Sequence, residues 1–174
     1  MRHVLTTPRL VLRPVTRDDE GALTVHWRAP DVRRFLFDGE VLPAEEIAEA
    51  IEDSVRPLAG PPGGAGDVAA LWVVTEAGAG TLVGTTGLRP LDDAGTELFY
   101  SLAPEVWGKG YATEAAGAVL EFALGPLGLP EVLAEIDEGN TASAAVAGRL
   151  GMTPFDVVPG LLGPMVRYRR AAGA

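Results

Sequence analysis

The chain has 174 residues, 47% of them apolar and none of them cysteine, and its 24 acidic and 14 basic residues give a net charge of −10. This length predicts one domain over residues 1–174, and the lack of cysteine excludes disulfides, thiolate zinc sites and an acyl-cysteine intermediate. The acidic charge disfavours a nucleic-acid partner and mildly favours an amine, while the absence of a long apolar run or signal peptide predicts a cytoplasmic protein without a membrane partner.

The first third of the chain predicts one strand and two helices. Residues 9–15 alternate polar and apolar side chains, which is typical of a strand. Thr16 and the acidic residues after it predict a helix start, and a second helix is expected from Pro43 to about Leu58. Residues 60–67 are rich in glycine and proline and predict a loop.

The remainder predicts strands broken by two helices. The pattern indicates a hairpin of residues 68–75 and 81–88, a strand over 96–102, a helix from 112, a strand over 131–137, a short helix over 140–150 and one or two strands to about 170. This order favours an α/β (α+β) layered fold with a largely antiparallel sheet.

The only lysine, Lys109, lies between Gly108 and Gly110, where a predicted strand gives way to a helix. With 22 glycines in the chain, chance alone supplies roughly two or three such triplets, and three occur. No Ser, Thr, Asp or Asn caps the helix, so its first N–H groups are available to a phosphate or to water. The run is neither a P-loop nor a dinucleotide fingerprint. The residues alone leave both a phosphate site and a solvated turn open.

The run Tyr100–Ala115 resembles the acetyl-CoA-binding core of GNAT acetyltransferases, and more narrowly that of the ribosomal-protein N-acetyltransferase branch. Three further segments agree in order and spacing: residues 7–14 with the branch's opening strand, residues 82–88 with its central hairpin strand, and Asn140–Ser143 followed by residues 149–152 with its Asn-x-x-Ser…Lys-Leu-Gly-Phe segment. Together these segments span nearly the whole chain. The departures are Phe99 for a usual glycine, Arg149 for lysine and Met152 for phenylalanine.

The resemblance implies a GNAT-like domain whose mixed, mostly antiparallel sheet is flanked by helices and splayed at the acetyl-CoA site, between the strands ending near Leu102 and Asp137. Pro104 suits the interrupted ladder because proline cannot donate a ladder hydrogen bond. It also implies acetyl-CoA as co-substrate and no metal, with the pyrophosphate on backbone N–H groups of residues 108–113 and the thioester carbonyl near residues 100–102. The implied contacts are Tyr100, Ser101, Leu102, Gly108, Lys109, Gly110, Tyr111, Ala112, Thr113 and Asn140.

The activity implied by the resemblance is direct attack of a primary amine on the thioester, the acceptor being a protein N-terminus or a small molecule. Glu97 is the candidate base; a water chain, or a Glu97 exposed on an edge strand, is the alternative. Asn140 and Ser143 are implied catalytic residues near the cofactor and could equally cap a helix. Tyr100 and Tyr111 could protonate the thiolate or pack in the core.

Other residues receive structural interpretations. Glu114 suits the dipole of the helix that it begins, and His3 and His26 are expected at the surface or in packing. An acceptor wall is expected from Trp27, Arg28 and residues 35–37. A homodimer, a catalytically idle acyl-CoA-binding module and a nucleotide-phosphate enzyme using the Gly108 turn all stay open.

Overall fold

The computed structural model describes residues 3–55, 68–92 and 94–173. Within them lie eight strands, five α-helices and two short 3-10 helices. Their bounds, in chain order, are β1 (Leu5–Thr6), β2 (Leu10–Pro14), η1 (Arg17–Asp19), α1 (Glu20–Arg28), α2 (Pro30–Leu36), α3 (Ala44–Val55), β3 (Ala70–Glu76), β4 (Leu82–Leu91), β5 (Gly95–Leu102), η2 (Pro104–Val106), α4 (Tyr111–Leu124), β6 (Glu131–Asp137), α5 (Thr141–Arg149), β7 (Thr153–Gly160) and β8 (Gly163–Ala171).

These strands form one sheet in the order β1-β2-β3-β4-β5-β6-β8-β7. Every neighbouring pair is antiparallel except β5 and β6, which confirms the predicted mixed, mostly antiparallel sheet. β5 pairs with β4 along its whole length, from Gly95 to Leu102. With β6 it pairs at a single position, Glu97 with Leu133. Beyond that position the two parallel strands separate, so the sheet is open at its centre.

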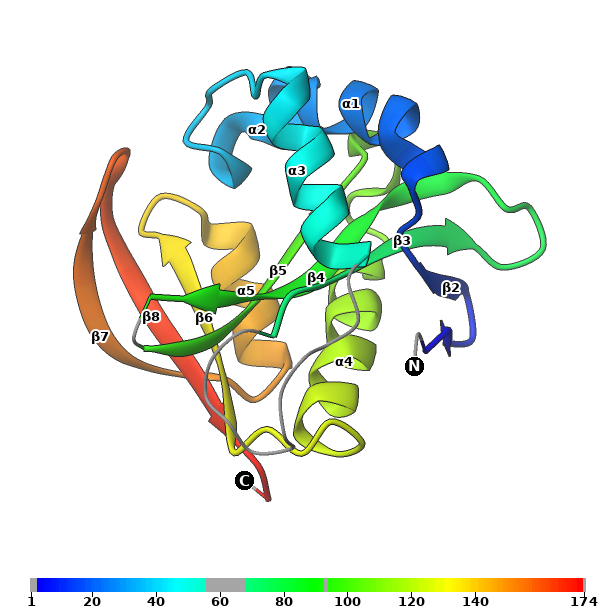
Figure 1. Cartoon of the computed structure of the whole chain (residues 1–174). Helices are drawn as coiled ribbons and strands as arrows, with labels where there is room; N and C mark the ends of the chain where they lie inside the picture. The colour runs from blue at the N-terminus through cyan, green and yellow to red at the C-terminus, as the bar shows by residue number, and fades with distance from the viewer. Residues whose placement is uncertain (1–2, 56–67, 93, 174) are drawn as a thin grey trace.

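Helices α1, α2 and α3 cover one face of the sheet, and α4 and α5 cover the other (Figure 1). Each face has its own apolar cluster, one including Leu98 and Leu102 under α4 and the other packed by Phe99 under α1–α3. Successive side chains of a strand point to opposite faces. Glu97 and Ser101 therefore lie on the α1–α3 side of β5, the same side as Phe99.

The prediction of two early helices was wrong, because three precede β3. Ala29 has an extended conformation (φ −61°, ψ 129°) and Pro30 begins α2, so α1 ends at Arg28. This is the usual effect of proline on the preceding residue. Thr16 is the N-cap of η1 rather than of α1, and its N–H donates to Oδ2 of Asp19 at 2.8 Å. The expected end of the second helix at Leu58 and the loop over 60–67 lie outside the described residues.

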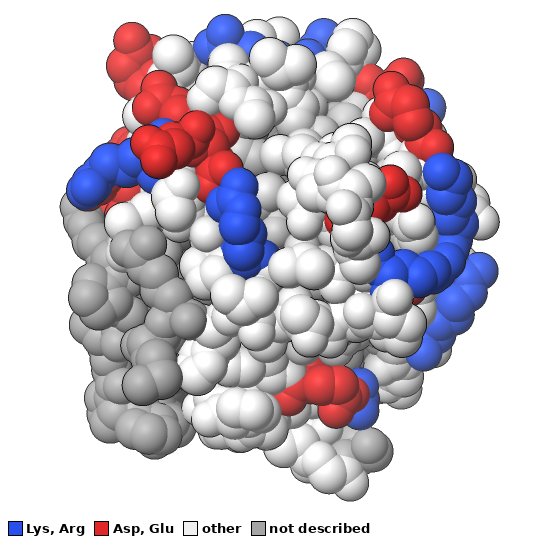
Figure 2. Space-filling view, turned by 90° about the vertical axis from the view of Figure 1, so that its right-hand side faces the viewer, with Lys and Arg blue, Asp and Glu red and all other residues white. Residues whose placement is uncertain are grey.

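On the face drawn in Figure 2, acidic and basic side chains lie among a larger number of uncharged ones, and several basic side chains lie next to one another along its right-hand edge. Within the described part of the chain, no helix is long and apolar enough to cross a bilayer.

Gly84, in β4, allows a close approach between β4 and β5. A Cβ at this position would lie 2.1 Å from the carbonyl oxygen of Ser101 and 2.9 Å from Cα of Leu102. We expect Gly84→Ala to lower the free energy of unfolding by about 2–3 kcal/mol, because two paired strands must separate. Denaturant unfolding measures the change. The control is Gly148→Ala in α5, whose Cβ would meet nothing within 4 Å. Equal stabilities for the two variants would contradict the close approach.

Candidate active site

The gap between β5 and β6 opens into a cavity of about 830 Å³. Its walls come from residues 97–102 of β5, 134–137 of β6, the start of α4 and one side of α5. The predicted site residues that line it are Glu97, Tyr100, Ser101, Leu102, Gly108, Gly110, Tyr111, Ala112, Thr113, Asn140 and Ser143. Lys109 does not line it; its Nζ lies 6.0 Å from the ring centre of Tyr111. The cavity thus brings together predicted site residues that are up to 46 positions apart in sequence (97 to 143).

The N-terminus of α4 presents unpaired backbone donors to this cavity. Its N-cap, Gly110, has a left-handed conformation (φ 78°) and offers no side-chain cap. The first helical N–H with an acceptor in this turn is that of Glu114, which donates to the carbonyl of Gly110 at 3.1 Å. The N–H groups of residues 111–113 therefore point out of the helix end, where the helix dipole also favours an anion. This end of the cavity fits a pyrophosphate.

Glu114 links the N-terminal segment to α4 through hydrogen bonds with Thr7 and Arg9. Its Oε1 accepts hydrogen bonds from Oγ1 of Thr7 (2.6 Å) and the N–H of Arg9 (3.0 Å), and its Oε2 accepts from Nε of Arg9 (2.6 Å). Arg9 also donates to the carbonyl of Lys109 at 2.8 Å. The sequence interpretation of Glu114 as structural agrees with these contacts, but it missed Arg9. Two of the resemblance segments, residues 7–14 and 100–115, contained the partners without showing that they meet.

Glu114→Gln is expected to lower the free energy of unfolding by about 1–2 kcal/mol at neutral pH, because charge-assisted hydrogen bonds are lost. Burial opposes ionisation of Glu114, but hydrogen bonds from Thr7 and Arg9 outweigh it and lower its pKa. A carboxyl with a lowered folded-state pKa stabilises above its unfolded-state pKa, and this contribution is lost as pH falls through the folded value. Urea unfolding at stepped pH should therefore show the difference shrinking below the ordinary value of 4.5.

The control for this experiment is Glu20→Gln. Glu20 is likewise an acid in the first turn of a helix, α1, but it is exposed whereas Glu114 is partly buried. We expect little change in stability at any pH, since surface substitutions of this kind are usually small. A difference between Glu114→Gln and the wild type that stays constant down to acid pH would contradict the carboxylate's role.

Glu97 lies at the point where β5 and β6 separate. Its side chain is buried, with Oε2 accepting from Nε of Arg89 at 2.6 Å and Oε1 accepting the N–H of Glu135 at 3.2 Å. The alternative of an exposed edge-strand glutamate is therefore wrong, because β5 lies inside the sheet. An ionised carboxylate offers about four acceptor positions, so two stay available to a proton donor. Glu97 also lines a second cavity of about 470 Å³ on the α2 side.

Asn140 and Ser143 meet at the start of α5. Oδ1 of Asn140 accepts the N–H of Ser143 at 3.2 Å, so the capping interpretation is correct, and both residues also line the larger cavity. The hydroxyl of Tyr100 faces Ser143 and has no hydrogen-bond partner of normal geometry among the described residues. Burial raises the pKa of Tyr100, which keeps its proton in place. Tyr111 differs, because its hydroxyl donates to Glu76 at 2.9 Å.

A buried chain of polar groups behind β5 was not predicted from the sequence. Nε2 of His26 lies 3.0 Å from Oγ of Ser101, which lies 2.9 Å from Oγ1 of Thr85. Trp27 donates to the same Thr85 oxygen at 3.2 Å. Burial lowers the pKa of His26 despite the Ser101 contact, so its ring is neutral at pH 7. These hydrogen bonds hold the Ser101 side chain in place. The burial of His26 among them agrees with its interpretation as a packing residue.

The expected acceptor wall is correct only in part. Phe35 lines both cavities. Trp27 is buried in the cluster under α1–α3, and Arg28 donates to the carbonyl of Leu42 at 2.8 Å; neither lines a cavity. The short break at Pro30 explains the difference, since it turns α2 rather than α1 toward the opening.

Residues 9–153 match the family model of the acetyltransferase (GNAT) domain, so the chain belongs to the GNAT acetyltransferase family. It is 32% identical over 103 residues to the uncharacterised protein YkkB of Bacillus subtilis, a match covering 58% of this chain and 60% of that protein. It is 25% identical to an uncharacterised N-acetyltransferase, p20, of Bacillus licheniformis, covering 85% of this chain and 81% of that one.

Solved structures of other acetyltransferases share the fold. The ribosomal L7/L12 α-N-protein acetyltransferase RimL, in complex with coenzyme A, superposes with a TM-score of 0.78 at 15% identity, over 97% of this chain and 98% of that one. The spermidine N-acetyltransferase of Vibrio cholerae, with coenzyme A and spermine, gives 0.77 at 17% identity, over 95% and 97%. These matches confirm the fold implied by the resemblance. A ribosomal-protein acetyltransferase, RimL, is among the proteins that share this fold.

Proposed function

We propose that this chain transfers the acetyl group of acetyl-CoA to the nitrogen of a primary amine. The observation that carries the proposal is the single cavity at the parted strands β5 and β6, which joins the uncapped start of α4 to the buried carboxylate of Glu97. A phosphate end and a base end in one cavity suit a long phosphorylated thioester. Family membership supplies acetyl-CoA-dependent acetylation in general.

In this proposal the co-substrate supplies an activated acetyl group, and the chain's residues place and deprotonate the acceptor. Backbone N–H groups of residues 108–113 hold the pyrophosphate, and backbone groups of residues 100–102 face the thioester. Glu97 takes the proton that the amine loses as its C–N bond forms. The C–S bond breaks, and the leaving thiolate takes the proton of the Tyr100 hydroxyl, which faces Ser143 and regains a proton from solvent after turnover. Asn140 lies beside the pantetheine region and fixes Ser143 by its capping bond.

The acceptor is one of two kinds of primary amine. The named activities of the two structural neighbours illustrate both: RimL acts on a ribosomal protein's α-amine and the Vibrio enzyme on spermidine. The net charge of −10 favours either kind of cationic acceptor over a nucleic acid.

Mass-spectrometric screening tests this function directly. The purified chain is incubated with acetyl-CoA and a panel of primary amines and N-terminal peptides, and a mass increase of one acetyl group on nitrogen is the expected result. Binding of acetyl-CoA with no acceptor modified would favour the idle acyl-CoA-binding module instead. Binding of nucleotides but not of coenzyme A would contradict the assignment of the α4 end.

A further inference from the structure

The second cavity, of about 470 Å³, lies next to Glu97 on the α2 side of the sheet. It combines carboxylates with an apolar lining. The carboxylates are Asp38, Glu97, Glu135 and Asp137. The apolar side chains include Phe35 and Leu36 from α2, Leu161 from the β7–β8 turn and Met165 from β8. Because Glu97 lines both cavities, this one adjoins the place where the proposed acceptor loses its proton.

Two of these carboxylates have arginine partners and two do not. Arg89 pairs with Glu97 at 2.6 Å, and Arg167 pairs with Glu135 at 2.6 Å. Among the described residues, Asp38 and Asp137 form no ion pair with an arginine or with Lys109. The negative charge left over in this cavity is therefore concentrated on the two aspartates.

Asp137 is the more unusual of the two. Its Oδ1 atom is buried and has no hydrogen-bond partner among the described residues. Burial raises the pKa of Asp137, and the nearby charge of Asp38 raises it further. A buried carboxylate oxygen without a donor, beside a second carboxylate, is unfavourable until a cation joins them. The pair therefore lacks a positively charged partner that the described chain does not supply.

The distance along the sheet limits what this partner can be. Oε1 of Glu97 accepts the N–H of Glu135 at 3.2 Å, and Asp137 lies two residues further along β6, which corresponds to about 7 Å at the usual strand rise. Apolar side chains line the cavity that both residues share. The arrangement suits a flexible aliphatic chain with a nitrogen at each end. A single ammonium group would occupy only one end.

We propose that the acceptor is a small aliphatic diamine, one amino group being acetylated beside Glu97 while the second, protonated, binds the carboxylates of Asp38 and Asp137. This inference rests on the proposed acetyl transfer. The methylene chain contacts Phe35, Leu36 and Met165, which exclude water from it. The second ammonium supplies the donors that Oδ1 of Asp137 lacks, so affinity depends on both charges of the acceptor.

Steady-state kinetics with cadaverine, its monoamine counterpart pentylamine and a tetrapeptide that has a free N-terminal amine but no charged side chain test the proposal. We expect kcat/KM for cadaverine to exceed that for pentylamine by about tenfold or more. Asp137→Asn and Asp38→Asn should each remove most of this preference by lowering kcat/KM for cadaverine alone. Asp137→Asn should also raise the melting temperature of the ligand-free protein, since it removes a negative charge from a group whose buried Oδ1 has no donor among the described residues.

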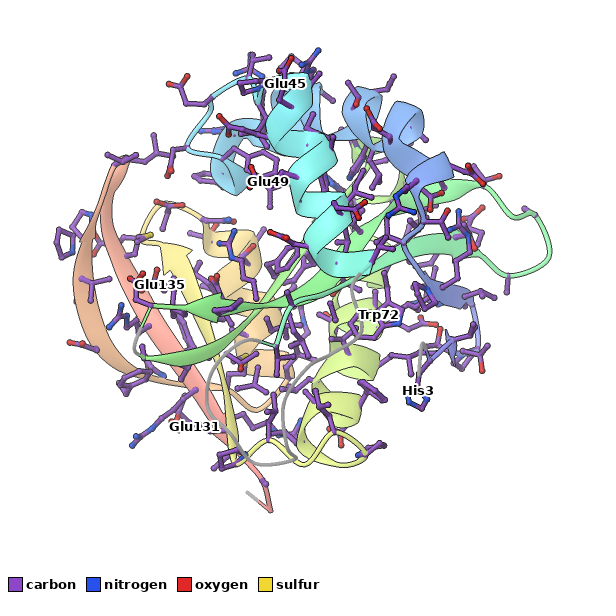
Figure 3. All side chains as sticks on the ribbon, in the orientation of Figure 1. His3, Glu45, Glu49, Trp72, Glu131 and Glu135 are labelled. Atoms are coloured by element: carbon purple, nitrogen blue, oxygen red, sulfur yellow. The ribbon has the colours of Figure 1, made fainter. Side chains whose placement is uncertain are left out.

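The matched control is Glu131→Gln, which removes one carboxylate at the opposite end of β6, far from Glu135 (Figure 3). It should leave the cadaverine preference intact. Equal rates for cadaverine and pentylamine, a preference for the tetrapeptide, or loss of the preference in Glu131→Gln would each overturn the diamine assignment while leaving acetyl transfer in place. If none of the three acceptors is acetylated, the diamine assignment also fails, and the proposed function then depends on the wider panel.

Discussion

Replacing Gly110 with glutamate should weaken acetyl-CoA binding by about a hundredfold, or roughly 2.7 kcal/mol. Gly110 is the N-cap of α4 and has φ 78°, a region that other residues adopt with strain. A glutamate there would place its own negative charge at the helix end that favours an anion, where it would compete with the pyrophosphate and repel it. Its side chain would also approach Nη2 of Arg9, which lies 3.5 Å from the position of a Cβ. Calorimetric titration with acetyl-CoA measures the loss.

Gly110→Gln separates charge from strain, because it has the same size and the same backbone requirement without the charge. We expect it to bind acetyl-CoA more weakly than the wild type and clearly more tightly than Gly110→Glu. Unfolding curves for both variants check that α4 is retained. If Gly110→Glu binds acetyl-CoA as the wild type does, the start of α4 is not the pyrophosphate site.

Glu97→Gln should lower kcat by about a hundredfold or more at neutral pH, with little change in acetyl-CoA affinity. The amide keeps an oxygen to accept the N–H of Glu135 but cannot take a proton from the acceptor. As pH rises, a larger share of the acceptor amine is already deprotonated. The deficit should therefore be greatest near pH 7 and decrease in alkaline buffer. Rates of CoA release over a range of pH give the profile.

Glu121→Gln is the control for this substitution. Glu121 is also ion-paired, to Arg170 at 2.7 Å, but it lies on α4 and lines neither cavity. Its kinetics should match those of the wild type. A Glu97→Gln profile parallel to the wild type at every pH would remove Glu97 from proton transfer and leave the water chain as the alternative.

Much of the fold was predictable from local patterns. Residues 131–137 form β6 as expected, and the apolar stripe after Ala112 belongs to a helix that begins one residue earlier, at Tyr111. The uncapped start of α4 was also readable, because it depends only on which residues precede Tyr111. Features of this kind are set within a few neighbouring positions, so periodicity and capping rules suffice for them.

What the sequence did not show depends on contacts between distant segments. Arg9 and Glu114 are 105 residues apart, and His26 and Ser101 are 75 apart. Nothing local to Asp38 or Asp137 distinguishes them from the chain's other surface acids. They lie close together because Asp38, between α2 and α3, and Asp137, at the end of β6, line the same cavity. Sequence patterns predict which residues share a face of one element, whereas a site between elements requires the packing itself.

The parting of β5 and β6 leaves two strand edges inside the sheet, with Glu97 accepting the N–H of Glu135 at their junction. A ligand carrying amide groups can join such edges as a peptide joins the edge of a sheet, by β-augmentation. Recognition of this kind uses the main chain, so it is indifferent to most side-chain replacements. Evolution can therefore alter Phe35, Asp38 and Asp137 on the acceptor side without rebuilding the co-substrate side. One sheet can in this way serve many different amines.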